Sequence, residues 1–266
     1  MMFDFDTDRP VFARNYEDLG NGLGRVEIGH IQVKVPHHPF WVKFAAGHEP
    51  ETERVYRKLV HEGSIVLDIG AWIGSTILFG LACDAEKIIA LEPNPQSFTA
   101  IESMLALNPE LQQKVLVHEK AVSSCQQVLS MGMVEGETDT STSGLGGNDF
   151  EVQATTIPRL LEGLDIGRID LIKIDIEGAE VLLSDALAEL GKIHRRNIHL
   201  SIHVPFFPEY GDTQRFIDSL REFQVYDDRG DKLDHDEFRH RILSTEPNPM
   251  WGTRHGNFFE VVLIPG

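Results

Sequence analysis

Two short segments of the sequence combine residue types that could carry chemistry, and the first surrounds Asp68. Residues 66–75 read Val-Leu-Asp-Ile-Gly-Ala-Trp-Ile-Gly-Ser, so Gly70 and Gly74 stand where an apolar run meets a helical pattern. Glycine lets a ligand approach the backbone closely, and the following helix offers unpaired N–H groups to an anion. Glu92 ends the next apolar run, where an acidic residue is suited to binding ribose hydroxyls. The pattern predicts a nucleoside-bearing cofactor at the ends of parallel strands.

The residues of this loop also indicate which cofactor it binds. The dinucleotide pattern G-x-G-x-x-G is absent, because Gly70 is followed by Ala71 and Trp72, and this argues against an NAD-dependent oxidoreductase. A carboxylate at Asp68 would repel a pyrophosphate but attract an ammonium group. S-adenosylmethionine carries an ammonium, a carboxylate and a ribose but no phosphate. The loop therefore fits S-adenosylmethionine better than NAD.

The second segment, residues 169–180, places several charged residues on one strand. Lys173, Asp175 and Glu177 would share a face of that strand, with Asp175 near its carboxyl end, where doubly wound sheets bind ligands. His203 ends a neighbouring apolar run and should lie beside Asp175. His203 could act as a general base with a pKa near working pH, or Asp175, Glu177 and His203 could hold a divalent cation such as Mg²⁺. Both alternatives stay open, as does a salt-bridge or a catalytic role for Lys173.

The elements that must position these residues follow from hydrophobic patterning. The alternation of strands and helices predicts an α/β fold with a doubly wound, mostly parallel sheet. Residues 1–46 are expected to form an N-terminal β-rich extension to a domain spanning 47–266, and the polar segment 131–149 a loop or hairpin tip. We expect strands at 64–67, 87–91, 115–122, 151–155, 169–175, 197–203 and 258–264, and helices at 50–62, 75–83, 95–107, 157–164, 177–190 and 213–223.

Composition excludes several function classes. The formal net charge of −18 would repel nucleic acid and anionic membranes, so neither is expected as a partner. The first residues lack the basic and apolar regions of a signal peptide, and no apolar run approaches the length of a membrane span. Cys83 and Cys125 are isolated and expected to be reduced, which favours a cytoplasmic location. Self-association as a homo-oligomer is left open.

Four motifs together resemble the FkbM family of S-adenosylmethionine-dependent methyltransferases. They are Leu67–Gly74, Leu91–Pro95, Lys120–Val122 and the distinctive K-I-D-I-E-G-A-E run of Lys173–Glu180. The resemblance implies the Rossmann-like class I methyltransferase fold, a seven-stranded sheet with an antiparallel last strand. It also implies O-methylation of sugars, polyketides or other natural products.

The resemblance also implies roles for individual residues. The loop at Asp68 would hold the methionine part of the cofactor, Glu92 its ribose, and the residues after the third strand its adenine, while Asp175 would lie near the methyl group. The family often has Glu two residues before the histidine equivalent to His203, where this chain has Ser201. The expected catalytic residues are Lys173, Asp175 and His203; the expected cofactor-binding residues are Asp68, Gly70, Ala71, Gly74, Ser75, Glu92, Pro93, Lys120, Ala121 and Asp175.

The leading interpretation is an S-adenosylmethionine-dependent O-methyltransferase that acts on a hydroxylated small molecule by in-line displacement. An N-methyltransferase acting on a small amine is one alternative, since the acidic surface would tolerate a cationic acceptor. The other is a cofactor-binding homologue without catalytic activity. That alternative predicts damage to the Asp68 loop or to Asp175, and both are intact.

Overall fold

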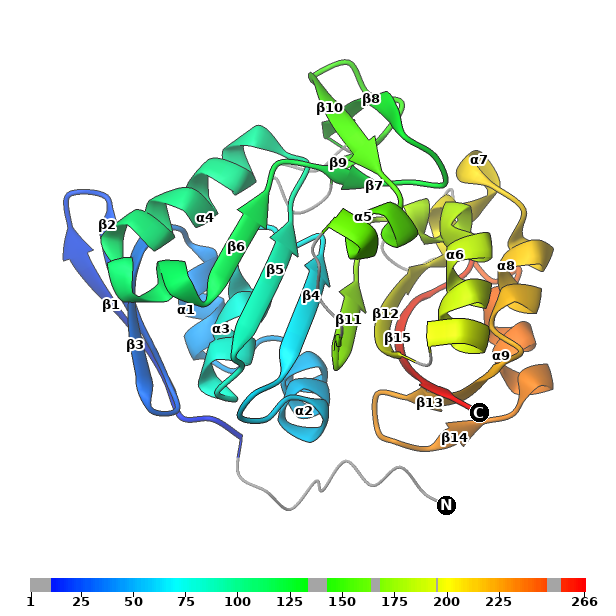
Figure 1. Ribbon diagram of the computed structural model, residues 1–266, viewed down its shortest axis with the longest axis horizontal. Helices are drawn as coiled ribbons and strands as arrows, with labels where there is room; N and C mark the ends of the chain where they lie inside the picture. The colour runs from blue at the N-terminus through cyan, green and yellow to red at the C-terminus, as the bar shows by residue number, and fades with distance from the viewer. Residues whose placement is uncertain (1–10, 134–142, 164–167, 195, 248–254) are drawn as a thin grey trace.

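The core of the protein is an eight-stranded sheet with the strand order β14-β13-β15-β12-β11-β4-β5-β6 (Figure 1). The computed structural model describes residues 11–133, 143–163, 168–194, 196–247 and 255–266. The strands of this sheet are β4 (Ile65–Ile69), β5 (Lys87–Leu91), β6 (Val115–His118), β11 (Leu171–Ile174), β12 (Asn197–His203), β13 (Phe223–Asp227), β14 (Lys232–Leu233) and β15 (Phe258–Pro265).

The predicted doubly wound, mostly parallel sheet is confirmed, with one strand more than the seven expected. β15 runs antiparallel to both of its neighbours, β12 and β13, as predicted for the last strand. The extra strand, β14, has two residues and pairs with β13 at the edge of the sheet. β13 was not predicted. The expected helix 213–223 runs past the end of α8 at Ser219 and includes Phe223, the first residue of β13.

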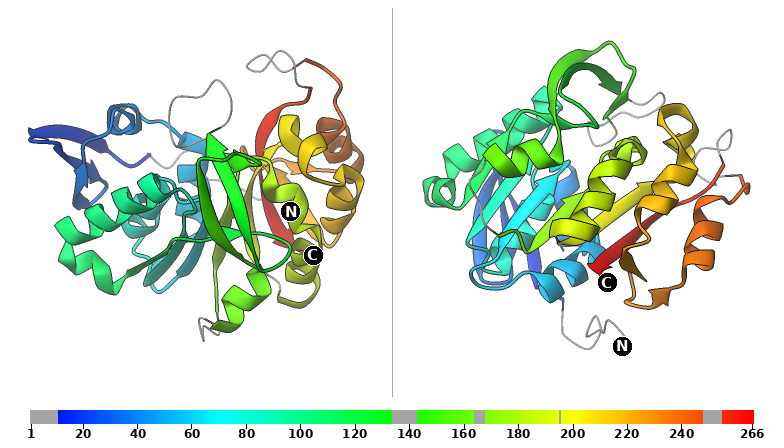
Figure 2. Two further views of the ribbon diagram at one scale, coloured as in Figure 1. Left: turned by 90° about the horizontal axis from the view of Figure 1, so that it is seen from above. Right: turned by 45° about the vertical axis from the view of Figure 1, so that its right-hand side comes forward.

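Helices cover both faces of the sheet, because alternate residues of each central strand enter two different cores. Leu67 and Ile69 of β4 pack with one helical layer, whereas Val66 packs with the other. The first layer contains α5 (Ile157–Gly163), α6 (Ser184–Glu189), α8 (Thr213–Ser219) and α9 (His235–Ile242). The second contains α1 (Phe40–Ala45), α2 (Pro50–Leu59), α3 (Ser75–Ala82) and α4 (Pro95–Leu107). Seen from above in Figure 2, the N-terminal elements and α6 lie on opposite sides of the sheet.

The predicted β-rich extension is confirmed as a three-stranded antiparallel sheet. Its strands are β1 (Arg14–Gly20), β2 (Leu23–Ile28) and β3 (Ile31–Pro36). Val26, Ile28, Val33 and Val35 are buried in the same core as α3 and α4, so the extension shares its core with the rest of the chain. Residues 1–10 of the predicted extension lie outside the described residues.

A second, four-stranded sheet stands beyond the carboxyl ends of β4, β5 and β6 (Figure 1). Its strands are β7 (Ala121–Val122), β8 (Gln127–Met133), β9 (Ser143–Leu145) and β10 (Phe150–Thr155), in the order β7-β10-β8-β9. The expected strand 115–122 is thus divided between two sheets, and the expected strand 151–155 belongs to the small one. The polar segment 131–149 includes the pairing of β8 with β9, and its centre, 134–142, lies outside the described residues.

The expected helix 177–190 is broken into three short pieces, and this break shapes the site. After β11, Glu177 and Gly178 both have positive φ values of 53° and 95°. The chain then forms η2 (Ala179–Leu183), α6 and the π-helical η3 (Leu190–His194). The remaining short elements are η1 (Pro109–Gln113), η4 (Val204–Phe206) and α7 (Phe207–Tyr210). Among the helices of the described ranges, none has both the length and the apolarity needed to cross a lipid bilayer.

Candidate active site

The loop after β4 is fixed by the ends of two neighbouring strands. The N–H groups of Gly70 and Ala71 both donate to the carbonyl of Leu91 at the end of β5, at 2.9 and 3.1 Å. Gly70 has a φ of +83°, and a Cβ there would overlap the backbone carbonyl oxygen of Asp175. The end of β11 therefore requires glycine at this position, whatever a bound ligand adds to that requirement. The close contact ties together the two segments that carry the motifs.

A buried ion-pair network lies beneath this loop and contains Asp68. The Asp68 side chain is fully buried; Oδ2 accepts a hydrogen bond from the Thr76 hydroxyl, and Oδ1 lies 3.5 Å from Lys173 Nζ. Lys173, 3% exposed, also donates to the Gly70 carbonyl and lies 3.4 Å from Asp175 Oδ2. Although burial alone would lower the pKa of Lys173, Asp175 and Asp68 raise it. The predicted salt bridge of Lys173 thus joins Asp68 and Asp175, and not Glu177.

Glu92 follows β5 and is held by backbone N–H groups from both sides. Its Oε1 accepts from Asn94 and its Oε2 from Trp72, each at 2.8 Å. Burial raises the pKa of Glu92 to about 8, against the opposing effect of these two hydrogen bonds. Because Ile69 and Leu91 are paired in register, Glu92 and the Gly70 loop start from adjacent positions of the sheet edge.

The other predicted cofactor residues surround the same edge. Gly74, with a φ of +96°, precedes α3, and Ser75 is the first residue of that helix. The first-turn N–H groups of a helix have no partner within it, so they are suited to an anion. Pro93 follows Glu92, and beyond β6 the side chain of Lys120 is exposed while Ala121 is buried.

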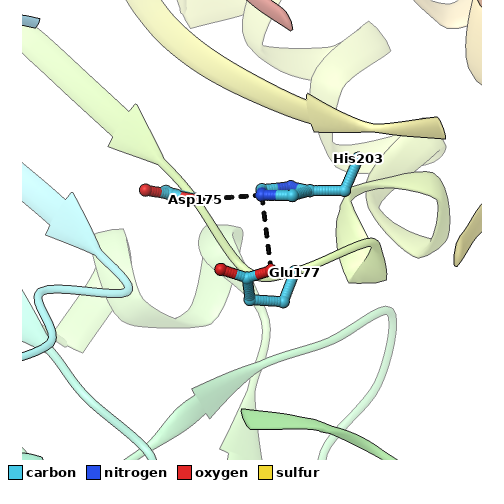
Figure 3. A group of neighbouring side chains, drawn as sticks. All are labelled: Asp175, Glu177 and His203. Atoms are coloured by element: carbon cyan, nitrogen blue, oxygen red, sulfur yellow. Dashed lines mark ion pairs between the residues drawn. The ribbon is translucent and has the colours of Figure 1, made fainter. Parts of the chain in front are cut away.

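His203 lies beside Asp175 and Glu177, as Figure 3 shows. Its Nδ1 lies 2.9 Å from Glu180 Oε1, while Nε2 faces Asp175 Oδ1 at 3.6 Å and Glu177 Oε2 at 3.5 Å. The structure therefore brings together the three residues that the sequence suggested as metal ligands. Their donor atoms lie within 4.8 Å of one another, and this is the one such group found among the described residues.

Glu180 is a residue whose part in the site the sequence interpretation missed. Its side chain is fully buried against His203. Oε1 also accepts from the N–H groups of Ile176 and Gly178, at 3.1 and 3.2 Å. The positive-φ turn at Glu177 and Gly178 folds Glu180 back towards the strand, and a helix starting at 177 would not do so.

The protonation of His203 differs from the expectation. Burial by itself would lower the pKa of His203, but Glu177, Glu180 and Asp175 together raise it to about 10. The three carboxylates therefore favour the protonated imidazole, whereas the sequence interpretation expected a pKa near working pH. Burial raises the pKa of Glu177 to about 7, whereas Lys173 and His203 outweigh burial and lower that of Asp175.

A further polar group on the same sheet face was also missed. His199 Nε2 lies 3.0 Å from Glu260 Oε2. Glu260 of β15 stands directly opposite Ser201 of β12 in the strand register. The chain therefore has a carboxylate beside Ser201, where the family often has Glu, but it comes from the neighbouring strand. Residues 61 apart in sequence gave no local signal for this pairing.

Comparison with known proteins gives a family for this arrangement. The family model described as the methyltransferase FkbM domain matches residues 68–233, which is more than half of the chain. No curated protein matches the chain.

Three solved structures illustrate its structural relatives. The methyltransferase FkbM from Methylobacillus flagellatus KT is 14% identical, with a TM-score of 0.44, over 84% of this chain and 52% of that one. Precorrin-6y C5,15-methyltransferase from Geobacter metallireducens GS-15 is 14% identical, with a TM-score of 0.44, over 82% and 90%. An S-adenosylmethionine-dependent O-methyltransferase from Thermotoga maritima is 13% identical, with a TM-score of 0.42, over 82% and 66%. The chain spans about half the length of the Methylobacillus protein. On the family match, which spans more than half of its length, the chain belongs to the FkbM methyltransferase family.

Proposed function

We propose that the enzyme methylates a hydroxyl oxygen of a small molecule, and that Asp175, Glu177 and His203 hold a divalent cation such as Mg²⁺ that activates this oxygen. The observation that carries the proposal is the orientation of His203. Glu180 fixes its Nδ1, so that Nε2 points at two carboxylates on the edge next to the Gly70 loop.

The donor set along the edge of the sheet fits S-adenosylmethionine. That cofactor would supply a methyl group from its sulfonium: a C–O bond forms to the acceptor as the C–S bond breaks, S-adenosylhomocysteine leaves as a neutral thioether, and the hydroxyl proton passes to water. Glu92 would accept the ribose hydroxyls, and the α3 N-terminus with Gly74 and Ser75 would take the methionine carboxylate. Asp68 would hold the loop through Thr76 and Lys173, because its buried carboxylate lies beneath the loop. The remaining contacts we propose are with Gly70, Ala71, Pro93, Lys120 and Ala121.

The arrangement of His203 supports a cation more than a general base. A metal-bound histidine commonly donates its other ring N–H to a carboxylate, which fixes the tautomer and the ring orientation. Glu180 stands in that position at 2.9 Å. Mg²⁺ is usually bound by one or two carboxylates together with substrate and water oxygens, which leaves room for the acceptor.

Charge supports a small molecule as the acceptor. A protein with a formal net charge of −18 repels the phosphate backbone of nucleic acids at long range. A cation would assist a hydroxyl acceptor, because a bound metal ion lowers the pKa of an oxygen ligand. An amine acceptor would gain less, because its neutral form already carries a nucleophilic lone pair.

The experiment that tests this proposal separates cofactor, cation and chemistry. Isothermal titration calorimetry measures S-adenosylhomocysteine binding, electron paramagnetic resonance measures Mn²⁺ binding, and labelled S-adenosylmethionine reports transfer to hydroxylated acceptors. We expect transfer with Mg²⁺ and its loss in EDTA. Asp175→Asn and Glu177→Gln should each weaken Mn²⁺ binding, whereas the exposed Glu110→Gln should not. Transfer that persists in EDTA, or Mn²⁺ binding equal in all variants, would refute the role of the cation.

A further inference from the structure

Four polar side chains from three elements gather on the sheet face beneath α2. Glu49 precedes α2, Thr52 lies in its first turn, His199 is on β12 and Glu260 is on β15. We call these four residues the Glu49–Glu260 cluster. His199 is paired in register with Lys173, so the cluster begins one strand away from the ion pairs of Asp175. The Glu49–Glu260 cluster is separate from the residues proposed to bind the cofactor and the cation.

The cluster is held together by its own contacts. His199 is 1% exposed, and its Nε2 lies 3.0 Å from Glu260 Oε2. The hydroxyl of Thr52 lies 3.4 Å from both carboxylate oxygens of Glu260. The Glu260 side chain keeps 18% of its surface exposed and that of Asp175 keeps 36%. The cluster is therefore ordered by its buried members and reachable through its carboxylates.

Two buried polar atoms of the cluster have no hydrogen-bond partner among the described residues. They are Glu49 Oε2 and His199 Nδ1. A buried polar atom without a partner costs folding free energy, so native proteins satisfy nearly all of them with protein groups, water or ligands. These two atoms belong to opposite sides of the cluster, α2 and β12. A group bound between them with several hydrogen-bond donors would satisfy the carboxylate oxygen of Glu49.

The charges around the cluster favour a cation. Burial raises the pKa of Glu49 to about 7, with Asp175 and Glu260 raising it further and Lys173 opposing them. The nearby cations are already engaged: Lys173 pairs with Asp68 and Asp175, and Arg14 pairs with Glu53. The negative charge of Glu260 and Asp175 therefore opposes the ionisation of Glu49, and a cation bound beside Glu49 would favour its ionised form.

The spacing of the cluster favours an organic cation over a metal ion. Within the described residues, three potential metal ligands converge to within 4.8 Å only at Asp175, Glu177 and His203, so Glu49, His199 and Glu260 do not form such a group. An ammonium group has three N–H donors on a tetrahedral nitrogen and can bridge separated carboxylates.

We propose that the Glu49–Glu260 cluster binds an ammonium group of the methyl acceptor, so that the substrate class is a hydroxylated small molecule that also carries an amine. Amino alcohols, amino sugars and phenolic amines belong to this class. The inference rests on the proposed function, because it places the acceptor hydroxyl at Asp175 and its ammonium group at Glu49 and Glu260. Recognition by charge-assisted hydrogen bonds would orient the acceptor without taking part in the chemistry.

Matched acceptor pairs test this proposal by binding alone. Protein saturated with S-adenosylhomocysteine and Mg²⁺ is titrated calorimetrically with glucosamine and glucose, 2-aminoethanol and ethane-1,2-diol, and tyramine and 4-ethylphenol. We expect the ammonium member of at least one pair to bind about tenfold more tightly or better. Glu49→Gln and Glu260→Gln should each remove most of that preference, because they keep shape and lose charge. The exposed Glu110→Gln is the control and should keep it.

The outcomes separate this inference from the proposed function. S-adenosylhomocysteine should bind wild type, Glu49→Gln and Glu260→Gln with equal affinity. A fall in that affinity in both variants would assign the cluster to the cofactor and overturn the inference. The absence of an ammonium preference in every pair, or its survival in both variants, would overturn it as well. Failure of wild type to bind S-adenosylhomocysteine would instead remove the proposed function, and this inference with it.

Discussion

Lys173 and His203 are two buried cations on neighbouring strands of one sheet, and their surroundings differ. Lys173 faces Asp68 and Asp175 and donates to the Gly70 carbonyl, so its charge is shared within a frame of fixed contacts. His203 faces three carboxylates, Asp175, Glu177 and Glu180, with one positive charge at most to neutralise them. Lys173 thus faces two carboxylates and His203 three, so negative charge exceeds positive charge by more around His203.

The difference indicates which side is built to hold the loop and which to accept a ligand. The Lys173 ammonium is held by Asp68, Asp175 and the Gly70 carbonyl, and its raised pKa keeps it charged. An imidazole can exchange its proton for a metal ion, and Glu180 already holds it in the orientation for that exchange. The Lys173 network thus positions the cofactor loop, and the His203 group provides the chemistry under the function proposed here.

The largest effect should come from His203→Ala. Removing the imidazole removes a donor to the proposed cation, so we expect turnover to fall by about 100-fold or more. The affinity for S-adenosylhomocysteine should stay near that of wild type, because His203 lies outside the Gly70 loop and Glu92. Exposed His240→Ala is the matched control. Loss of cofactor binding by the His203 variant, with the fold intact by circular dichroism, would contradict the division between the two sides.

Lys173→Met should have the next largest effect, on stability. It leaves Asp68 and Asp175 without their shared cation, and breaking a buried pair costs about 3–5 kcal/mol. Lys192→Met is the control, since Lys192 is exposed and lies 3.9 Å from an exposed Glu222, a surface pair that contributes about 0–1 kcal/mol. Urea unfolding measures both. Equal destabilisation in the two variants would show that the Lys173 network does not hold the frame.

The positions of the site residues at the strand ends could be predicted from the sequence, because each depends on the apolar run directly before it. Asp68, Gly70 and Glu92 each stand within two residues of the end of an apolar run, and parallel strands bring such ends to one edge. The expected positions of Asp175 and His203 followed from the same argument and were correct. The antiparallel β15 was located too, although that came from the family resemblance and not from the pattern alone.

The parts that could not be predicted depend on contacts between distant segments or on single backbone angles. The pairing of Glu260 with His199 follows from β15 entering the sheet beside β12. The protonation of His203 depends on Glu180, which reaches it because Glu177 and Gly178 adopt positive φ values. Neither hydrophobic periodicity nor motif spacing carries information about such a turn.

A smaller effect should separate two glycines with nearly equal backbone conformation. Gly70 and Gly63 have φ values of +83° and +82°, so alanine at either position carries a similar left-handed penalty of about 1–2 kcal/mol. A Cβ at Gly63 meets no atom within 4 Å, whereas one at Gly70 overlaps the Asp175 carbonyl. The free energy of unfolding should therefore be about 1–3 kcal/mol lower for Gly70→Ala than for Gly63→Ala. Equal midpoints in urea would mean that the contact between the loop and β11 is easily relieved.

The last effect we predict is a pH dependence of stability caused by Glu92. Its pKa is about 8 in the folded protein and 4.5 in the ordinary reference state, so the folded state holds a proton that the unfolded state has lost between these values. The contribution of Glu92 to stability is therefore present below about pH 4.5 and declines as pH rises towards 8, by at most about 1.4 kcal/mol per pH unit. Glu92→Gln should remove this decline, so the variant gains on wild type between pH 5 and about 8 in EDTA.

Adding S-adenosylhomocysteine sharpens this last prediction. Ribose hydroxyls that donate to the Glu92 carboxylate would favour its ionised form and lower its pKa towards the reference value. Saturating ligand should therefore flatten the slope of wild type and leave the slope of Glu92→Gln unchanged, as measured by urea unfolding at each pH. If the ligand leaves both slopes unchanged, Glu92 does not bind the ribose, and its burial serves only to anchor the Trp72 and Asn94 backbone.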